Sequence, residues 1–193
     1  MSTLPHLQDR RYTIEEFEKM DFGDRAAELI DGLIVIAKAY PSDQHGFITA
    51  NLGYHLRLAL DASRTEECRP MSTSGLYIRG FDHDLPNDSA FGPGLTVRCL
   101  NKDGTWSPSV IVEVLSKSDP ANLMAAKLLA YKAVPAIQDI LYLNQDKFYA
   151  LHHQRHDGQW QVGVELSGPD AEIIIERWNI RIQLEDVYER VFN

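Results

Sequence analysis

The segment Ser109-Val110-Ile111-Val112-Glu113-Val114-Leu115 decides how this chain folds. Apart from one residue it is typical of a β-strand that is buried on both faces. The exception is Glu113, because a carboxylate in such a strand is strongly unfavourable unless a charged partner meets it. A charged partner for Glu113 is therefore expected elsewhere in the sequence.

A helix predicted over residues 120–132 supplies a candidate partner. Met124, Lys127, Leu128 and Tyr131 recur at helical spacing and form its apolar face, so the lysine lies on the buried side. An acid in a core strand and a lysine on the next helix indicate a functional site. They are equally consistent with a structural ion pair that joins strand and helix, and both interpretations stay open at this point.

The totals suit one domain over residues 1–193, since 193 residues are enough for a sizeable core. No apolar run is long enough to span a membrane. The first 11 residues are polar, carry no secretion signal and are expected to be flexible. Cys68 and Cys99 are isolated in the sequence, which favours reduced cysteines and a cytoplasmic location.

The net charge of −9 does not favour nucleic-acid binding, because nucleic-acid binders usually carry a basic patch. It does not exclude a DNA enzyme that uses a metal ion, since the ion brings its own positive charge. None of the common nucleotide-binding or hydrolase motifs is present, so no organic cofactor is expected.

The remaining pattern predicts an α/β or α+β fold around a mixed sheet, because strands outnumber helices and separate the two long ones. Thr13-Ile14-Glu15-Glu16 is a capping box that predicts a helix to about Met20. Asp31-Gly32 between two apolar runs predicts a hairpin. A long helix is expected over 43–62 and a long loop over 80–94. Further strands are expected at 76–78, 95–100, 139–144, 147–153, 160–166 and 172–175, with a helix at 184–191.

Two more residues stand out near the start of the chain. Glu28 lies in the apolar run before the Asp31-Gly32 turn, where it is either a second site carboxylate or an acid on the solvent face. His45 begins the first long helix in phase with Ile48 and Leu52. It could contact a phosphate or position a metal-bound water, or it could simply belong to a polar helix start.

Three aspartates, Asp82, Asp84 and Asp88, lie in the long loop, and carboxylates are natural ligands of Mg²⁺. For each of them a solvated loop acid is the alternative. Three histidines follow later, His152, His153 and His156. The first two would point to opposite faces of a strand, so we expect them at the surface and not at a metal.

The order of these signals resembles the Uma-type restriction endonuclease family, a branch of the PD-(D/E)xK nuclease superfamily. The resemblance runs from about Tyr12 to Phe192 and rests on these segments: Glu28-Leu29-Ile30-Asp31-Gly32, Pro41-Ser42-Asp43-Gln44-His45, Val112-Glu113-Val114-Leu115-Ser116, and Lys127-Leu128 with Tyr131. It implies a restriction-endonuclease-like mixed sheet flanked by helices, with an additional antiparallel C-terminal hairpin region.

The resemblance also implies roles for individual residues. Glu113 matches the acid of the superfamily motif, but Leu115 stands where the motif lysine normally lies. Lys127 matches a lysine that has migrated to the following helix in this family. Glu28 and His45 match the acid of the first hairpin and the histidine at the helix start.

One departure concerns the aspartate that the family places before the catalytic glutamate. Pro93-Gly94 is the best match here, which puts a glycine where the aspartate belongs, and Asp88 is a shifted alternative. The expected function is a Mg²⁺-dependent (or Mn²⁺-dependent) DNA endonuclease, plausibly a homodimer. Its metal is expected on Glu113 and Asp88. The alternatives are a catalytically impaired module that binds DNA or protein, and a structural protein.

Overall fold

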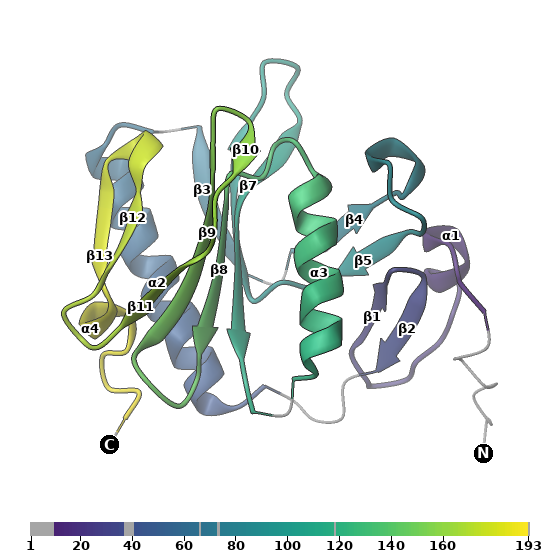
Figure 1. The fold of residues 1–193 in the computed structure, drawn as a ribbon, viewed down its shortest axis with the longest axis horizontal. Coiled ribbons are helices and arrows are strands. Elements are labelled where there is room, and N and C mark those ends of the chain that lie inside the picture. Colours follow the sequence, from purple (N-terminus) through teal and green to yellow (C-terminus); the bar gives the residue numbers. More distant parts are fainter. Residues whose placement is uncertain (1–9, 37–40, 66, 73, 118, 193) are drawn as a thin grey trace. The chain divides into compact units, whose positions relative to one another are not determined.

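The computed structural model describes residues 10–36, 41–65, 67–72, 74–117 and 119–192 (Figure 1). The expected flexibility of the N-terminus falls mostly on residues outside this described part. The chain divides into two compact units, and each unit is built from three separate stretches. The first unit takes the described residues of Met1–Tyr40 together with Gly75–Gly92 and Pro120–Val134. The second takes Pro41–Ser74, Pro93–Asp119 and Pro135–Asn193. A single domain over the whole chain stays a prediction.

The first unit is a small antiparallel sheet with the strand order β2-β1-β5-β4. Its strands are β1 (Ala27–Ile30), β2 (Leu33–Ile36), β4 (Leu76–Ile78) and β5 (Ser89–Phe91), and its helices are α1 (Ile14–Phe17), α3 (Ala121–Ala133) and the 3-10 turn η1 (Phe81–His83). Its apolar core contains Tyr12, Ile14, Leu29, Ile34 and Ala90.

Local sequence signals account for the start of this unit. Asp31 and Gly32 take φ angles of 48° and 74°, which is the two-residue turn that suits a twisted hairpin. The turn sets Ile30 opposite Leu33. The predicted capping box is present, since the Glu16 N–H donates to Thr13 Oγ1 at 3.2 Å and the Thr13 N–H donates to the Glu16 carboxylate at 3.0 Å. The helix ends at Phe17, earlier than predicted.

The second unit holds a larger sheet with the order β10-β9-β8-β7-β6-β3, and β11 also pairs with β9. Only β7 and β8 are parallel among these pairs, so the sheet is mixed, as expected. Its strands are β3 (Cys68–Ser72), β6 (Leu95–Leu100), β7 (Trp106–Leu115), β8 (Asp139–Asn144), β9 (Tyr149–His156), β10 (Gln159–Trp160) and β11 (Val164–Ser167). The unit also contains α2 (Asp43–Ala62), the hairpin β12 (Glu172–Ile175) and β13 (Ile180–Gln183) joined by the 3-10 turn η2 (Glu176–Trp178), and α4 (Leu184–Val187).

Residues 109–114 of strand β7 are buried on both faces, which confirms the prediction made from this segment of sequence. Val110, Val112 and Val114 belong to the main core, together with apolar residues of α2, β12, β13 and α4. Side chains alternate along a strand, so Ile111 and Glu113 point to the opposite face. Their exposed fractions are 0% and 7%. Glu113 is therefore buried, as the apolar residues around it in the sequence predicted.

Three strands were not foreseen, and they are β3, β5 and β13. The predicted loop over 80–94 contains β5, which is only three residues long and lies between Asp88 and Gly92. Strand β3 carries Pro70 and occupies one edge of the larger sheet. A proline is tolerated there because an edge strand leaves some of its N–H groups unpaired. Strand β13 has four residues and forms a two-stranded sheet with β12. Short strands and edge strands give little periodic signal, which explains these omissions.

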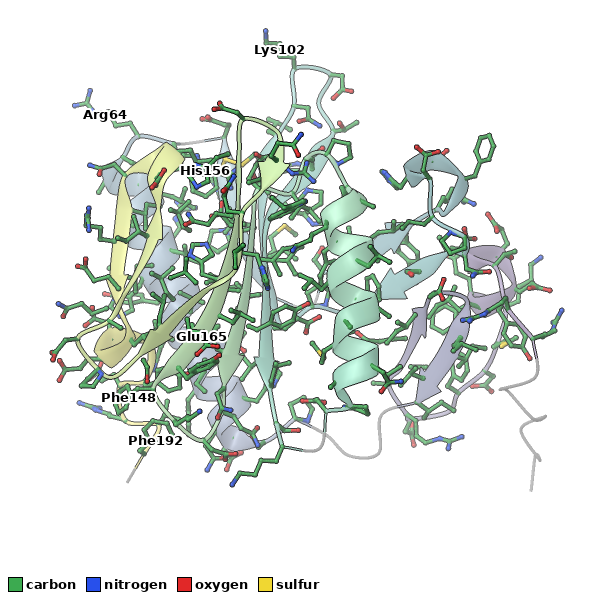
Figure 2. All side chains as sticks on the ribbon, in the orientation of Figure 1. Arg64, Lys102, Phe148, His156, Glu165 and Phe192 are labelled. Carbon is green, nitrogen blue, oxygen red and sulfur yellow. A yellow bond between two sulfur atoms is a disulfide. The ribbon has the colours of Figure 1, made fainter. Side chains whose placement is uncertain are left out.

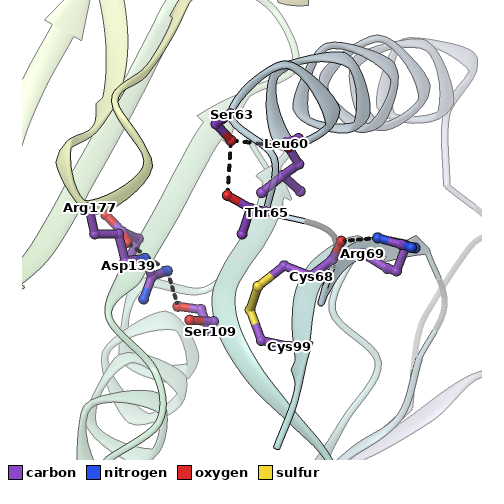
Figure 3. Close-up of a disulfide and its surroundings, with 9 residues drawn as sticks. All are labelled: Leu60, Ser63, Thr65, Cys68, Arg69, Cys99, Ser109, Asp139 and Arg177. Carbon is purple, nitrogen blue, oxygen red and sulfur yellow. Dashed lines mark hydrogen bonds and ion pairs between the residues drawn. A yellow bond between two sulfur atoms is a disulfide. The ribbon is translucent and has the colours of Figure 1, made fainter.

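His152 and His153 are buried, so the expectation that they lie at the surface is wrong. They point to opposite faces of β9 as predicted, but their exposed fractions are 3% and 7%. His152 Nε2 lies 3.0 Å from Asp139 Oδ1 on β8. The other carboxylate oxygen of Asp139 lies 3.2 Å from Arg177 Nη2 of η2, and that guanidinium also donates to the Ser109 carbonyl at 3.2 Å (Figure 3). These contacts make a buried polar network that joins β7, β8 and β9 to η2.

Cys68 and Cys99 form a disulfide, so the expectation of isolated, reduced cysteines is wrong (Figure 3). Strands β3 and β6 pair so that the two cysteines are direct partners in the antiparallel register, with their Cα atoms 4.0 Å apart. They are separated by 31 positions in the sequence. Sequence spacing could not show the pairing, because it depends on the register between two distant strands.

An aromatic cluster holds the C-terminal end of the second unit. The Tyr188 hydroxyl donates to the Asn144 carbonyl at 2.7 Å and to the Tyr149 carbonyl at 2.9 Å. Phe148 and Phe192 pack ring to ring with centroids 5.2 Å apart (Figure 2).

Among the described residues, no helix has the length and apolar character needed to cross a membrane.

Candidate active site

Glu113 is the central residue of the candidate site in the second unit. The parallel pairing of β7 with β8 makes Tyr142 its direct neighbour on the same face of the sheet. Burial raises the pKa of the Tyr142 phenol, and the Glu113 carboxylate raises it further. The Glu113 carboxylate and the Tyr142 phenol thus come from neighbouring positions on β7 and β8.

Gly94 lies just before β6, close to the backbone that leads into Glu113. A Cβ atom at this position would lie 3.4 Å from His45 Nε2, 3.6 Å from Thr49 Oγ1 and 3.6 Å from the Val112 carbonyl oxygen. Gly94 is not among the glycines with a positive φ. The backbone therefore does not require glycine here, and a side chain would contact its neighbours at ordinary distances.

His45 completes this group from the start of α2. Its backbone N–H donates to the hydroxyl of the N-cap residue Ser42 at 3.2 Å. Burial lowers the pKa of the imidazole below its ordinary value of 6.5, while the Asp119 carboxylate and a hydrogen bond to the Val114 backbone act in the opposite direction. The ring is therefore mainly neutral at neutral pH. The structure thus places His45 beside Gly94 and beside the strand segment that carries Glu113.

Glu28 and Lys127 form an ion pair within the first unit. Lys127 Nζ lies 3.0 Å and 2.8 Å from the two carboxylate oxygens of Glu28, and the Gly92 N–H donates to the first of these oxygens at 3.0 Å. The side chains are 9% and 25% exposed. The ammonium also lies 5.6 Å from the ring centroid of Phe91. Lys127 is thus on a buried face, as predicted.

The partner of Lys127 within its own unit is Glu28, a pairing that the sequence pattern did not suggest. Glu28 is consequently not a simple acid on the solvent face of the hairpin, because its carboxylate accepts bonds from a lysine and from a backbone amide. Glu113 belongs to the other unit. Its predicted pairing with Lys127 stays a prediction.

Asp88 has a clear structural role in the first unit. Its two carboxylate oxygens accept hydrogen bonds from the backbone N–H groups of Ile14 at 3.1 Å and Gly80 at 2.9 Å. Its own carbonyl accepts from the Gly32 N–H at 2.7 Å. One residue therefore ties the start of α1, the long loop and the hairpin turn together. That Asp88 also binds a metal stays a prediction.

The side chains present fit a divalent ion only in part. No group of three or more His, Cys, Asp or Glu side chains is placed to hold a metal within the described residues. Mg²⁺ is commonly held by one or two carboxylates and takes its remaining ligands from water and substrate phosphates. Glu113 supplies one such carboxylate, and Gly94 supplies none. These residues therefore suit a weak site that substrate oxygens would complete.

Sequence reasoning missed Tyr142 as a member of this site. The available signal was a tyrosine within the mainly aliphatic segment of β8. This signal was insufficient, because it does not reveal how β8 is aligned with β7. Only the pairing of β7 with β8 shows that Tyr142 and Glu113 are neighbours.

The lowered pKa of His45 predicts a loss of stability in mild acid. Unfolding restores the ordinary pKa, so the unfolded chain binds the proton more readily than the folded protein does. The free energy of unfolding therefore decreases as the pH falls below about 6.5. His45→Gln should reduce this loss. We expect urea midpoints at about pH 7.5 and about pH 5.5 to differ less in the variant than in the native protein.

His55→Gln, on the same helix but outside the group around Gly94, is the matched control for that experiment. Its urea midpoints should keep the native dependence on pH. An unchanged pH dependence in His45→Gln would show that the imidazole does not resist protonation in the fold.

Comparisons with known proteins agree with the fold. The family model described as "Uma2: Putative restriction endonuclease" matches residues 14–178. A solved structure described as "a putative nuclease belonging to DUF820 from Anabaena variabilis ATCC 29413" has a TM-score of 0.70. It is 17% identical and covers 93% of this chain and 99% of its own. At that identity the likeness concerns the fold alone, and it confirms the expected mixed α/β architecture. No curated protein matches the chain.

The family model covers far more than half of the chain, and it spans the first hairpin, the Glu113 strand and the Lys127 helix. The family expected from the motifs is thereby confirmed: this chain belongs to the Uma2 family.

Proposed function

We propose that this protein is a Mg²⁺-dependent endonuclease that hydrolyses phosphodiester bonds in DNA. Membership of a family described as restriction endonucleases supports the reaction class. The observation that carries the proposal is the burial of Glu113, a carboxylate with 7% exposure on a strand that is otherwise apolar there. A buried carboxylate is a natural ligand for a divalent ion, and such an ion would also attract phosphate.

Glu113 would hold the ion, and Mn²⁺ should replace Mg²⁺ because both prefer oxygen ligands. When bound, the ion would polarise a phosphate and lower the pKa of a water molecule. His45, kept mainly neutral by burial, can accept or donate a hydrogen bond to water near position 94. These residues all belong to the second unit.

Lys127 would contribute positive charge toward the phosphate. Glu28 accepts the ammonium through both carboxylate oxygens, which fixes the lysine side chain in one conformation. A preorganised cation stabilises developing negative charge better than a mobile one, because no reorganisation is needed during the reaction. Glu28 would thus act by positioning Lys127.

The net charge of −9 opposes DNA binding, so the metal and Lys127 would have to supply local attraction.

A homodimer would place one site on each strand of a duplex. This oligomeric state stays a prediction, and the mass measured in solution by sedimentation would check it. The cytoplasmic location also stays a prediction.

A second function is favoured by one specific observation. Gly94 lies beside His45 at a position whose backbone would accept a side chain, yet it offers no carboxylate. A member of the family with one ligand missing could keep the fold and bind DNA or protein without cutting. The two functions differ in whether the native protein cleaves DNA.

Glu113→Gln should reduce cleavage of supercoiled plasmid about 100-fold or more, because it removes a charged ligand while keeping the side-chain shape. Cleavage by the native protein should require Mg²⁺ or Mn²⁺ and stop in EDTA. Lys127→Met should also be inactive. Gel assays of nicked and linear product measure these outcomes.

Glu165→Gln is the matched control, since Glu165 is an exposed carboxylate on β11 of the same unit (Figure 2). It should cut like the native protein. Cleavage that survives EDTA, or a fully active Glu113→Gln variant, would refute the metal mechanism.

Gly94→Asp should strengthen the response to Mg²⁺, because it adds a carboxylate beside the strand segment of Glu113 without demanding a left-handed backbone. We expect Mg²⁺ to raise the melting temperature of this variant more than that of the native protein. Gly94→Asn has nearly the same shape without the charge and should show no gain. Equal behaviour of the two variants would exclude position 94 from the metal site. Asp88→Asn, measured alongside, shows whether the alternative ligand contributes.

A further inference from the structure

The Tyr142 hydroxyl is buried and has no hydrogen-bond partner among the residues that the structure describes. The whole side chain is only 5% exposed. An unsatisfied buried hydroxyl destabilises a fold, because its hydrogen bonds to water are lost and nothing replaces them. Native proteins rarely retain such a group without a reason, and a ligand that completes the bond is one of the recognised reasons.

The position of the hydroxyl points toward a ligand of Glu113. Tyr142 and Glu113 are in register on adjacent parallel strands and project from the same face of the sheet. The phenol hydroxyl is not hydrogen-bonded to that carboxylate. The donor is therefore still available to a third group.

The phenol offers an O–H donor at neutral pH, because a tyrosine hydroxyl ordinarily keeps its proton there. On the next strand, the His153 ring packs edge to face against Tyr142 with centroids 6.2 Å apart, which limits movement of the phenol ring. Tyr142 thus presents a fixed O–H donor beside a carboxylate.

A phenylalanine would keep the ring contact with His153 without a hydroxyl. Ile140, Leu141 and Leu143 in the same strand are all fully buried. Packing therefore does not explain the hydroxyl. A neutral donor next to an acceptor-only carboxylate suits an anionic ligand that is shared through a metal ion, since the donor binds the anion and the carboxylate binds the cation.

We propose that Tyr142 Oη donates a hydrogen bond to a non-bridging phosphate oxygen of DNA bound at Glu113. The identity of this ligand rests on the proposed function. Tyr142 is then a substrate-binding residue of the site, and it acts on the substrate while Glu113 acts on the metal.

Tyr142→Phe removes only the hydroxyl and tests this role. We expect kcat/KM for duplex DNA to fall about 10-fold to 100-fold, as for a hydrogen bond to a charged group. The urea midpoint should stay the same or rise, because the lost hydroxyl had no partner in the free protein. Tyr188→Phe is the matched control. Its hydroxyl is bonded to two backbone carbonyls, so this variant should lose stability and keep its kcat/KM.

A binding measurement separates this proposal from the nuclease function. Fluorescence anisotropy of a labelled DNA duplex, with Ca²⁺ in place of Mg²⁺, should give a Kd about 10-fold weaker for Tyr142→Phe than for the native protein. If the native protein never cuts DNA but Tyr142→Phe binds it more weakly, the nuclease function fails and the role of Tyr142 stands. If both proteins cut and bind DNA equally, or if neither binds it, the role of Tyr142 is refuted.

Discussion

The structure of the second unit depends on a central strand whose residues 109–114 are all buried. Strand β7 contributes Val110, Val112 and Val114 to the core, and Ile111 and Glu113 on its opposite face are buried as well. Every side chain in that segment must therefore be apolar or be matched by a specific partner. Glu113 is the charged exception in that segment. Its neighbours Tyr142 on β8 and His45 at the start of α2 are therefore the residues whose polar groups define the candidate site. The fold and the site are in this sense specified by the same residues.

The sequence predicted those elements whose signals are local. The bounds of α2, β4, β6, β8 and β12 agree with prediction because each is a periodic or apolar run with clear ends. The elements and contacts that were missed depend on distant pairing. The partners of Cys68 and His152 lie on other strands, and no spacing rule reveals them. Burial of a polar residue is equally hard to predict when its partner is remote.

The same distinction applies to the candidate site. The burial of Glu113 and Lys127 could be inferred, because charged residues in apolar patterns are visible in a single sequence. Which residue pairs with which could not, and the contact of Glu28 with Lys127 is the clearest case. For Asp88 the loop position suggested a ligand, whereas its bonds to backbone amides give it a structural task. A carboxylate in a loop can thus serve the backbone as readily as an ion.

The alternation of the chain between its two units has a consequence for how the protein is made. Strand β1 pairs with β5 through Leu29 and Ala90, so the first sheet cannot be completed until the chain has passed through α2 and β3. Strand β7 likewise awaits β8, which is synthesised only after α3. Folding therefore involves long-range contacts in both units, which is typical of slow folding. Neither unit is one continuous stretch of the chain, so no truncation would separate one unit from the other.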